Sequence, residues 1–387
     1  MGSTVMSSAV IIHNHPIHYQ HLLFCELAKK GLEFEVLFTA SSSRSRIEAP
    51  LPERQEYVYS IGYSGSYESV GKLNAAFFVW RSLNRLRPKV VILSGYCDVA
   101  TWTGWLWAGI YRAGRILWAE SNVFDHRRNR WKESIKRLFV KGCDCAHVYG
   151  TSNKEYLEEL GMPADRIILK RAVANTALFL KASVVSTQKP DCITLLYCGR
   201  FSSEKNLAML FRALAAVGQD RRKPRIALKL IGYGPLEDSL HILARDLRIA
   251  GLVEFAGKAN QADLPQMFAA ADVLILPSIC EPWGLVVNEG MLSGLAVAVS
   301  NQCGCAADLV TPETGWTFSP YDEVGLTELI EKIAETPRLE HKRMGSAARK
   351  LASEYSPENC AVLVMQTVSE IAQKRRVTGN APTAQQF

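Results

Sequence analysis

One stretch of the chain combines the signals of a buried strand, a loop and a helix: residues 272–294, DVLILPSICEPWGLVVNEGMLSG. Its apolar run from Val273 to Leu276 ends at Pro277 and is typical of a central strand in a parallel sheet. A helical pattern starts near Leu285. Open α/β sheets bind ligands at the loops that leave the carboxyl ends of their strands. The order of strand, loop and helix along this stretch therefore predicts an α/β fold with a ligand site in the loop.

The loop and the helix that follows carry two carboxylates, Glu281 and Glu289. The amides of Leu285 and Val286, directly after Gly284, would point from the helix N-terminus into the crevice, where they could bind an anion. The carboxylates could accept hydrogen bonds from hydroxyl groups. A phosphorylated sugar is the simplest ligand that needs both. The alternative interpretation is that Glu281 is a solvated loop residue and Glu289 a surface position of the helix.

Residues 281–289, with the sequence EPWGLVVNE, resemble the two-glutamate signature of the retaining family-4 glycosyltransferases. The resemblance implies the GT-B fold, an α/β architecture in which two doubly wound, Rossmann-like domains face each other across a cleft. A C-terminal helix crosses back to the first domain in that fold. The resemblance also implies that Glu281 contacts the donor sugar, that Glu289 holds the ribose of the nucleotide, and that the turn from Gly284 to Val286 binds the donor.

A second motif, GRFSSEKN, covers residues 199–206 after an expected strand. Cleavage of a glycosyl–phosphate bond leaves negative charge on the leaving oxygen. Arg200 can direct two donors at that charge, and Lys205 can add a compact positive charge. The family has an Arg and a Lys at this spacing on the donor diphosphate, so the resemblance implies catalytic and donor-binding roles for both; the alternative is a surface pair. It also implies that Gly257 and Lys258 pass beside the nucleotide base.

In the first half of the chain, a strand expected at residues 9–12 is followed by HNHPIHYQH, which holds four of the eight histidines. Three interpretations stay open: a metal site, partly solvated caps, or a cleft wall in which His15 and His18 touch the acceptor or a phosphate. The first βα turn of a doubly wound domain faces its ligand crevice, which favours the third.

The family often has a His beside the reaction centre at the end of a later strand, and Glu120 aligns with that place. A carboxylate there could orient the acceptor hydroxyl or accept its proton. The alternative is a Glu that caps the following turn.

A chain of 387 residues exceeds what one hydrophobic core usually holds. We expect an acceptor-binding, Rossmann-like domain over residues 1–180, a linker over 181–191, and a nucleotide-sugar-binding, Rossmann-like domain over 192–356. A crossover helix over 357–376 and a disordered tail over 377–387 would complete the chain.

The net charge of +7, from 45 basic and 38 acidic residues, is compatible with an anionic substrate or an acidic membrane surface and is too small to indicate nucleic acid. Residues 127–141, RRNRWKESIKRLFVK, form a basic amphipathic pattern. A helix packed by its apolar face is the default interpretation, and binding to anionic lipid is the alternative.

Ten cysteines without any C-x-x-C pair indicate free thiols, and the first eight residues lack the pattern of a signal peptide. The longest apolar stretch, residues 99–111, is too short to span a bilayer. A cytoplasmic protein is therefore expected, either free or peripheral to the inner face of the membrane.

The expected function is transfer of a sugar from a UDP- or GDP-linked donor to an acceptor hydroxyl with retention of anomeric configuration. The acceptor would be a glycan, a lipid-linked glycan or a small molecule in glycan, glycolipid or metabolite biosynthesis. No cofactor is expected, and no metal, because the chain has no D-x-D triad. The alternatives are a sugar-nucleotide epimerase or phosphorylase of the same fold, and a sugar-nucleotide-binding protein without catalysis.

Overall fold

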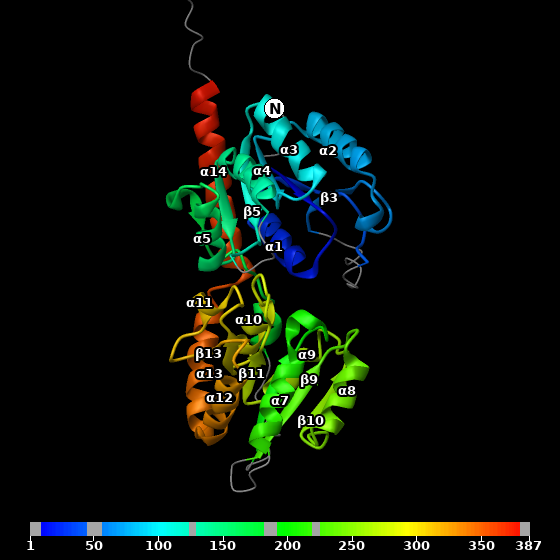
Figure 1. Ribbon diagram of the computed structural model, residues 1–387. Helices are drawn as coiled ribbons and strands as arrows, with labels where there is room; N and C mark the ends of the chain where they lie inside the picture. The colour runs from blue at the N-terminus through cyan, green and yellow to red at the C-terminus, as the bar shows by residue number, and fades with distance from the viewer. Residues whose placement is uncertain (1–8, 45–55, 124–128, 182–191, 219–224, 380–387) are drawn as a thin grey trace, which may run out of the picture.

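The computed structural model describes residues 9–44, 56–123, 129–181, 192–218 and 225–379. Figure 1 shows two α/β domains, one above the other, each built on a sheet flanked by helices. Both sheets are parallel throughout. The prediction of two doubly wound domains is therefore confirmed.

Among the described residues, the first sheet has seven strands in the order β3-β2-β1-β4-β5-β6-β7. Their bounds are β1 (Ala9–His13), β2 (Phe34–Phe38), β3 (Val58–Ile61), β4 (Val90–Ser94), β5 (Gly114–Ala119), β6 (Cys145–Val148) and β7 (Ile167–Ile168). The central strands β1 and β4 are buried except for Ser94 at the end of β4, because helices cover both faces of the sheet. The strand order reverses between β1 and β4, and this switch point is where a doubly wound sheet opens a crevice.

The helices of the first domain lie in two layers. Their bounds are α1 (His18–Lys29), α2 (Lys72–Leu86), α3 (Val99–Ile110), α4 (Arg130–Lys141) and α5 (Thr151–Glu159), with 3₁₀ turns η1 (Tyr67–Ser69) and η2 (Ala164–Arg166). The short α6 (Thr176–Phe179) follows, and its Phe179 packs in the core of the second domain. Buried residues of α2, α3, α4 and α5 share one hydrophobic cluster on one face of the sheet. Buried residues of α1 belong to a second cluster on the other face.

Within the described residues, the second sheet has six strands in the order β10-β9-β8-β11-β12-β13. Their bounds are β8 (Cys192–Cys198), β9 (Arg225–Ile231), β10 (Val253–Gly257), β11 (Val273–Leu276), β12 (Ala296–Ser300) and β13 (Gly315–Phe318). The strand predicted at Val273–Leu276 is confirmed as β11, and it lies between β8 and β12 with all four residues buried. The order of this sheet reverses between β8 and β11.

Helices of the second domain connect and cover these strands. Their bounds are α7 (Leu207–Gly218), α8 (Glu237–Asp246), α9 (Leu264–Ala269), α10 (Leu285–Leu292), α11 (Ala306–Leu309), α12 (Glu323–Glu335) and α13 (Arg338–Ala352), with the 3₁₀ turn η3 (Ser203–Lys205). The predicted helix near Leu285 is confirmed as α10. Its first turn follows Gly284, whose φ of 98° lies in the left-handed region that glycine tolerates.

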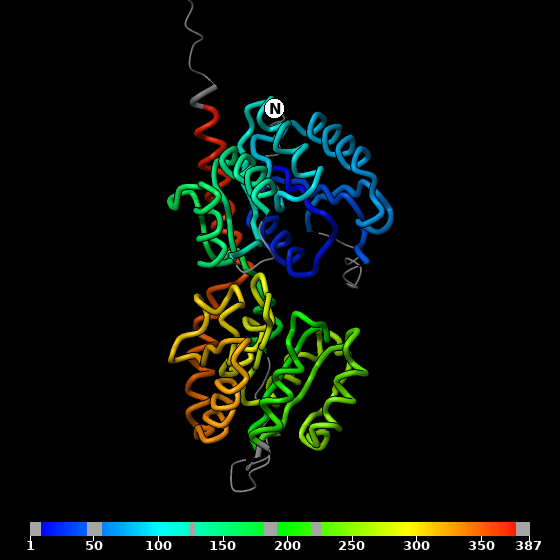
Figure 2. The backbone as a smooth tube through the Cα atoms, in the orientation of Figure 1, coloured from blue at the N-terminus to red at the C-terminus, as the bar shows by residue number. Residues whose placement is uncertain are grey.

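The last helix, α14 (Pro357–Gly379), leaves the second domain and runs along the first (Figures 1 and 2). Val364, Val368 and Ile371 of α14 join the cluster that contains the buried face of α1. The helix begins where the crossover helix was predicted to begin, but the predicted end at residue 376 is wrong. Residues 377–379, assigned to the tail, are helical, because the chain has no glycine or proline between Pro357 and Gly379 to interrupt the helix. The predicted linker residues 182–191 and the tail beyond 379 lie outside the described residues.

Candidate functional site

Two loops of the second domain meet at its switch point. One follows β8 and carries Arg200 and Lys205, and the other follows β11 and carries Glu281. The Lys205 ammonium contacts the Glu281 carboxylate, and the two side chains are only 17% and 16% exposed. The backbone also joins the loops, because the N–H of Ile279 donates to the carbonyl of Glu204 at 2.9 Å. Two of the predicted site residues, 76 positions apart in the sequence, are thus in direct contact.

The loop that carries Arg200 follows Gly199, whose carbonyl would be only 1.9 Å from a Cβ atom added at Gly232. A Cβ at Gly234 would come within 2.4 to 2.7 Å of the backbone of Phe201. The two glycines after β9, Gly232 and Gly234, therefore allow the loop after β8 to pack directly on the loop after β9. The carbonyl of Arg200 accepts a hydrogen bond from the Tyr197 hydroxyl at 2.8 Å, while the Arg200 residue itself is exposed.

Glu289 lies one helical turn into α10, beyond the loop of Glu281. Burial raises the pKa of this half-buried carboxyl from 4.5 to about 7. The thiol of Cys198, at the end of β8, has its pKa raised by burial and then by the charge of Glu289, so the carboxyl faces the end of β8. Within the described residues, the Glu289 side chain has no hydrogen-bond or ion-pair partner, which leaves it available to a ligand.

The end of β10 completes this edge of the sheet. The N–H of Gly232 donates to the carbonyl of Gly257 at 2.9 Å, so the loop with Gly257 and Lys258 lies beside the loop after β9. The exposed Lys258 ammonium lies 5.5 Å from the centre of the Tyr233 ring. The predicted base-binding segment is therefore at the same edge of the sheet as Arg200, on the side away from Glu281.

The first domain has a cavity of about 360 Å³ at its own switch point. The ends of β1, β4 and β5 line it, with His13, His15 and Glu120 among the lining residues. Burial lowers the pKa of His13 to about 4, so this ring is neutral at physiological pH. His18 is the first residue of α1, is exposed, and is not part of the lining. The structure thus brings His15 and Glu120 to one cavity and leaves His18 outside it.

Glu120 belongs to a polar network that the sequence did not indicate. Its carboxylate accepts hydrogen bonds from the Tyr149 hydroxyl at 2.6 Å and from the Arg171 guanidinium at 2.9 Å. Desolvation alone would raise the pKa of Glu120, but the charge of Arg171 together with these hydrogen bonds outweighs it and holds the pKa below the ordinary value. Glu120 is therefore an ionised acceptor. Arg171 is 2% exposed and lies 51 positions from Glu120 in the sequence. Neither this spacing nor the residues around Arg171 indicated that it would pair with Glu120.

Both domains hold the loop of Glu281. The Asn122 side chain, from the first domain, donates to the carbonyls of Glu281 and Pro282 at 3.2 Å each. The ring of Trp283 is buried between Tyr149 and Tyr355, with ring centres 5.8 and 5.7 Å apart. Asn122 and Tyr149 were missed as functional residues, because only the folded chain brings them to this loop.

A second group of interdomain contacts lies at the start of α5. The N–H and hydroxyl of Thr151 donate to the Asp308 carboxylate at 2.9 and 2.8 Å. The Ser152 hydroxyl donates to the carbonyl of Gly304 at 3.1 Å, and the N–H of Gly304 donates to the carbonyl of Glu281 at 2.9 Å. These bonds connect α5 to the loop of Glu281 through a single glycine.

In the part of the chain that the structure describes, no three His, Cys, Asp or Glu residues are grouped as they would be around a metal ion. The histidine rings of residues 13–21 do not point at one common site. The His13 ring bonds the carbonyl of His15 at 3.0 Å, and the His21 ring bonds the Tyr57 hydroxyl at 3.2 Å. Over the same residues, no helix has the length and apolar character needed to cross a membrane.

Residues 181–351 match the protein family described as "Glycosyl transferases group 1". Glycogen synthase of Mycobacterium tuberculosis (strain ATCC 25618 / H37Rv) is 30% identical over 173 residues, which are 44% of this chain and 41% of that protein. The chain therefore matches less than half the length of this relative.

Two solved structures resemble almost the whole chain. Sucrose-phosphate synthase from Thermosynechococcus elongatus has a TM-score of 0.77 at 19% identity, over 95% of this chain and 99% of that one. HepE of Anabaena, solved in complex with UDP and glucose, has a TM-score of 0.70 at 18% identity, over 94% and 99%. The fold is GT-B, as predicted. The second domain accordingly matches the glycosyl transferases group 1 within a chain of GT-B architecture.

The raised pKa of Glu289 predicts a pH-dependent stability. In the unfolded chain this carboxyl ionises near pH 4.5, whereas in the folded protein it stays protonated up to about pH 7. The free energy of unfolding therefore falls as the pH rises from 4.5 to 7. Glu289→Gln should stabilise the ligand-free protein by about 2–3 kcal/mol at pH 8 and change little at pH 4.5.

Denaturant unfolding at the two pH values measures this difference. Glu328→Gln, on an exposed position of α12, is the matched control and should change stability at neither pH. Equal effects of the two substitutions at pH 8 would show that the carboxyl of Glu289 is not desolvated.

Proposed function

We propose that this protein is a retaining glycosyltransferase of the family-4 type, which moves a sugar from a nucleoside diphosphate to an acceptor hydroxyl. The observation that carries the proposal is the meeting of Lys205 and Glu281 at the switch point of the second sheet. Arg200 lies on the same loop as Lys205, and Glu289 lies on the helix that follows Glu281. The group 1 match covers this domain and supports the proposal.

Each donor-binding residue has a proposed role. Arg200 and Lys205 bind the diphosphate, together with the amides of Leu285 and Val286 at the start of α10. Glu289 accepts hydrogen bonds from the ribose hydroxyls and Glu281 from the donor sugar. Gly257 and Lys258 lie beside the base of a UDP- or GDP-linked donor. The structure of HepE with UDP and glucose supports a nucleotide-sugar ligand for this fold.

The proposed reaction breaks the bond between the anomeric carbon and the diphosphate oxygen, and it forms a bond from that carbon to the acceptor oxygen. Negative charge develops on the leaving oxygen, where Arg200, Lys205 and the dipole of α10 stabilise it. The acceptor proton passes to the leaving diphosphate on the same face of the sugar, which retains the anomeric configuration. Every step uses groups of the protein and the donor, and none requires a cofactor or a metal.

The first domain is proposed to bind the acceptor in the cavity beside His15 and Glu120. The ionised Glu120 carboxylate is suited to accept a hydrogen bond from the acceptor hydroxyl and so to orient its oxygen toward the anomeric carbon. His18, outside the lining, would contact only an acceptor that extends beyond the cavity. An acceptor in glycan, glycolipid or metabolite biosynthesis would fit this arrangement.

Replacing Lys205 tests the donor site. Lys205→Ala should lower the turnover of the matching donor by about 100- to 1,000-fold, because the leaving diphosphate loses the positive charge of the Lys205 ammonium beside it. A thermal-shift panel of UDP- and GDP-linked sugars identifies that donor, since a bound ligand raises the melting temperature. Release of nucleoside diphosphate only when an acceptor is present would exclude an epimerase, a phosphorylase and a protein that merely binds the donor.

Lys229→Ala is the matched control, because Lys229 also pairs with a glutamate of the second domain, Glu254, at 2.8 Å. It should leave turnover unchanged. Circular dichroism of both variants separates a loss of folding from a loss of chemistry. Full turnover by folded Lys205→Ala protein would overturn the assignment of this site.

Replacing Glu120 tests the acceptor side. Glu120→Gln should lower transfer by about 100-fold, because the acceptor hydroxyl loses an ionised hydrogen-bond acceptor. The dissociation constant of the donor should stay within about twofold, since the donor lies in the other domain. Tyr149→Phe is a comparison variant: it removes one hydrogen bond to Glu120 at 2.6 Å, keeps the carboxylate, and should lower transfer less than Glu120→Gln. Near-normal transfer by Glu120→Gln protein would remove Glu120 from the mechanism.

A further inference from the structure

The outer face of α4 exposes a stripe of large apolar side chains. Trp131, Ile135 and Leu138 are 83%, 56% and 60% exposed, and their spacing places them on one side of the helix. The default interpretation, a helix packed by its apolar face, is therefore wrong for these three side chains and holds for Phe139, which is buried. The buried residues of α4 are Phe139 and Val140, because a pattern of apolar positions does not tell which of two adjoining faces the sheet will cover.

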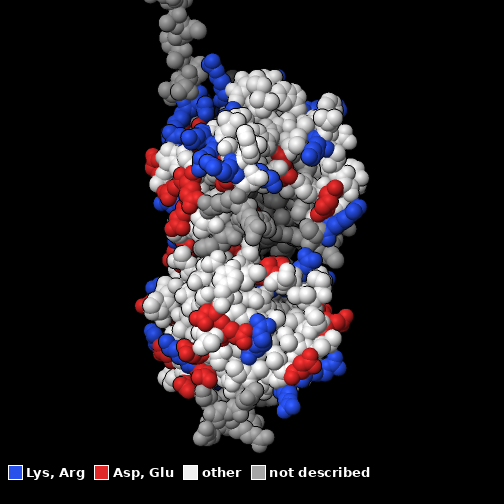
Figure 3. All heavy atoms as spheres, viewed as in Figure 1, with Lys and Arg blue, Asp and Glu red and all other residues white. Residues whose placement is uncertain are grey.

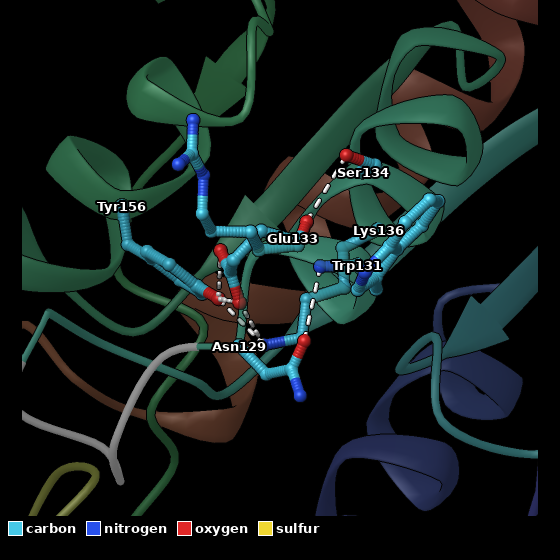
Figure 4. A network of polar contacts seen from close by, with 7 residues as sticks. Asn129, Trp131, Glu133, Ser134, Lys136 and Tyr156 are labelled. Carbon is cyan, nitrogen blue, oxygen red and sulfur yellow. Dashed lines mark hydrogen bonds and ion pairs between the residues drawn. The ribbon is translucent and has the colours of Figure 1, made fainter.

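Polar contacts on the inner side of α4 fix this orientation. The Lys136 ammonium donates to Glu133 at 2.8 Å and to the Tyr156 hydroxyl of α5 at 2.6 Å, and that hydroxyl donates to Glu133 at 3.0 Å. The Asn129 side chain accepts from the N–H of Trp131 at 3.0 Å and caps the helix. Figure 4 shows the network on one side of α4 and the indole of Trp131 directed away from Tyr156. The apolar stripe is thus held outward.

Basic side chains surround the stripe. Arg130, Lys132, Arg137 and Lys141 are exposed, and none has an ion-pair partner among the described residues. Figure 3 shows Lys and Arg side chains gathered over this part of the first domain. Exposed apolar groups bordered by unpaired positive charge match the surface of a bilayer that contains anionic lipid.

The neighbouring helix extends the apolar surface. Leu106 and Ile110 on the outer side of α3 are 52% and 57% exposed. The two helices pack together through Trp102 and Trp105 of α3, whose rings lie 4.9 and 5.8 Å from that of Phe139 in α4. The exposed side chains of α3 and α4 therefore belong to adjoining helices of one layer, which Figure 1 shows on the same side of the first domain.

This surface adjoins the cavity of the first domain. Helix α3 begins directly after Cys97 and Asp98, which line the cavity. The Lys136 ammonium of α4 lies 5.5 Å from the ring centre of Tyr96, another lining residue. A bilayer in contact with α3 and α4 would thus lie beside the cavity.

We propose that the outer faces of α3 and α4 dock on an anionic lipid bilayer and present the first-domain cavity to an acceptor carried by a lipid. The second part rests on the proposed function, since it assumes that the cavity binds the acceptor. The docking itself depends only on the exposed apolar stripe and its basic border. Association combines insertion of Trp131, Ile135 and Leu138 into the interface with attraction of the basic residues to lipid phosphates.

Sedimentation of the full chain with vesicles tests the docking. At low salt the protein should pellet with phosphatidylglycerol vesicles and stay in solution with phosphatidylcholine vesicles. Lys132→Ala combined with Arg137→Ala should weaken partitioning about 25-fold, at about fivefold for each basic residue near the surface. Trp131→Ala should weaken it about tenfold. Leu339→Ala and Lys342→Ala, at exposed positions of α13 in the second domain, are the controls and should bind as the unmodified protein does.

Two results would overturn the docking: protein that stays in solution with phosphatidylglycerol vesicles at low salt, or variants of α4 that bind as strongly as the controls. Light scattering tests whether a second copy of the chain covers this face instead of a bilayer. A dimer that forms with rising protein concentration and is abolished by Trp131→Ala, in protein that does not bind vesicles, would assign the face to that second copy. The thermal shift with UDP- and GDP-linked sugars should be the same for the α4 variants and the unmodified protein. If the protein does not bind vesicles but still shows the thermal shift with a nucleotide sugar, the docking is overturned and the proposed function stands. If the unmodified protein shows no thermal shift with any of these sugars, the result counts against the proposed function and not against the docking.

Discussion

The position of the Glu281 loop depends on contacts from both halves of the molecule. Lys205 pairs with its carboxylate from within the second domain, while Asn122 of the first domain binds the carbonyls of Glu281 and Pro282. Trp283, two positions further, is buried against Tyr149 of the first domain. A side chain held from both sides loses little additional freedom when a ligand binds, which favours a preorganised site. The relative placement of the two domains is therefore coupled to the geometry of the donor site.

The Lys205–Glu281 pair also has a chemical consequence. Both side chains are largely removed from water, so neither charge is well solvated without the other. A diphosphate that approaches Lys205 offers this ammonium a second anionic partner, and the Glu281 carboxylate then becomes available to the hydroxyls of the sugar. One ion pair of the ligand-free protein can thus be exchanged for two interactions with a single donor. The Glu289 carboxyl nearby, which has no partner in the described part of the chain, fits the same ligand, because ribose hydroxyls can supply hydrogen bonds to it.

The sequence predicted those parts of the fold that local patterns determine. The strand from Val273 to Leu276 was recognised because an uninterrupted apolar run ends at a proline, and α10 because a helical pattern follows a glycine. The ligand sites expected in the loop after Leu276 and at the first βα turn both lie where the strand order of their sheet reverses.

The sequence could not predict contacts between distant segments. Arg171, which pairs with Glu120 from 51 positions away, has no local signal, and the same holds for Asn122 and the Glu281 loop. The exposure of Trp131 was likewise beyond the sequence, because periodicity tells which side chains share a face and not whether another element covers it. Such features depend on the packing of layers, which a single sequence does not specify residue by residue.

The most direct measurement is a crystal structure with a bound nucleoside diphosphate. The expected result is diphosphate oxygens within about 3.2 Å of the Arg200 guanidinium and the Lys205 ammonium, at the start of α10, with the ribose on Glu289. A diphosphate bound away from these groups, with the Lys205–Glu281 pair intact and Glu289 empty, would contradict it.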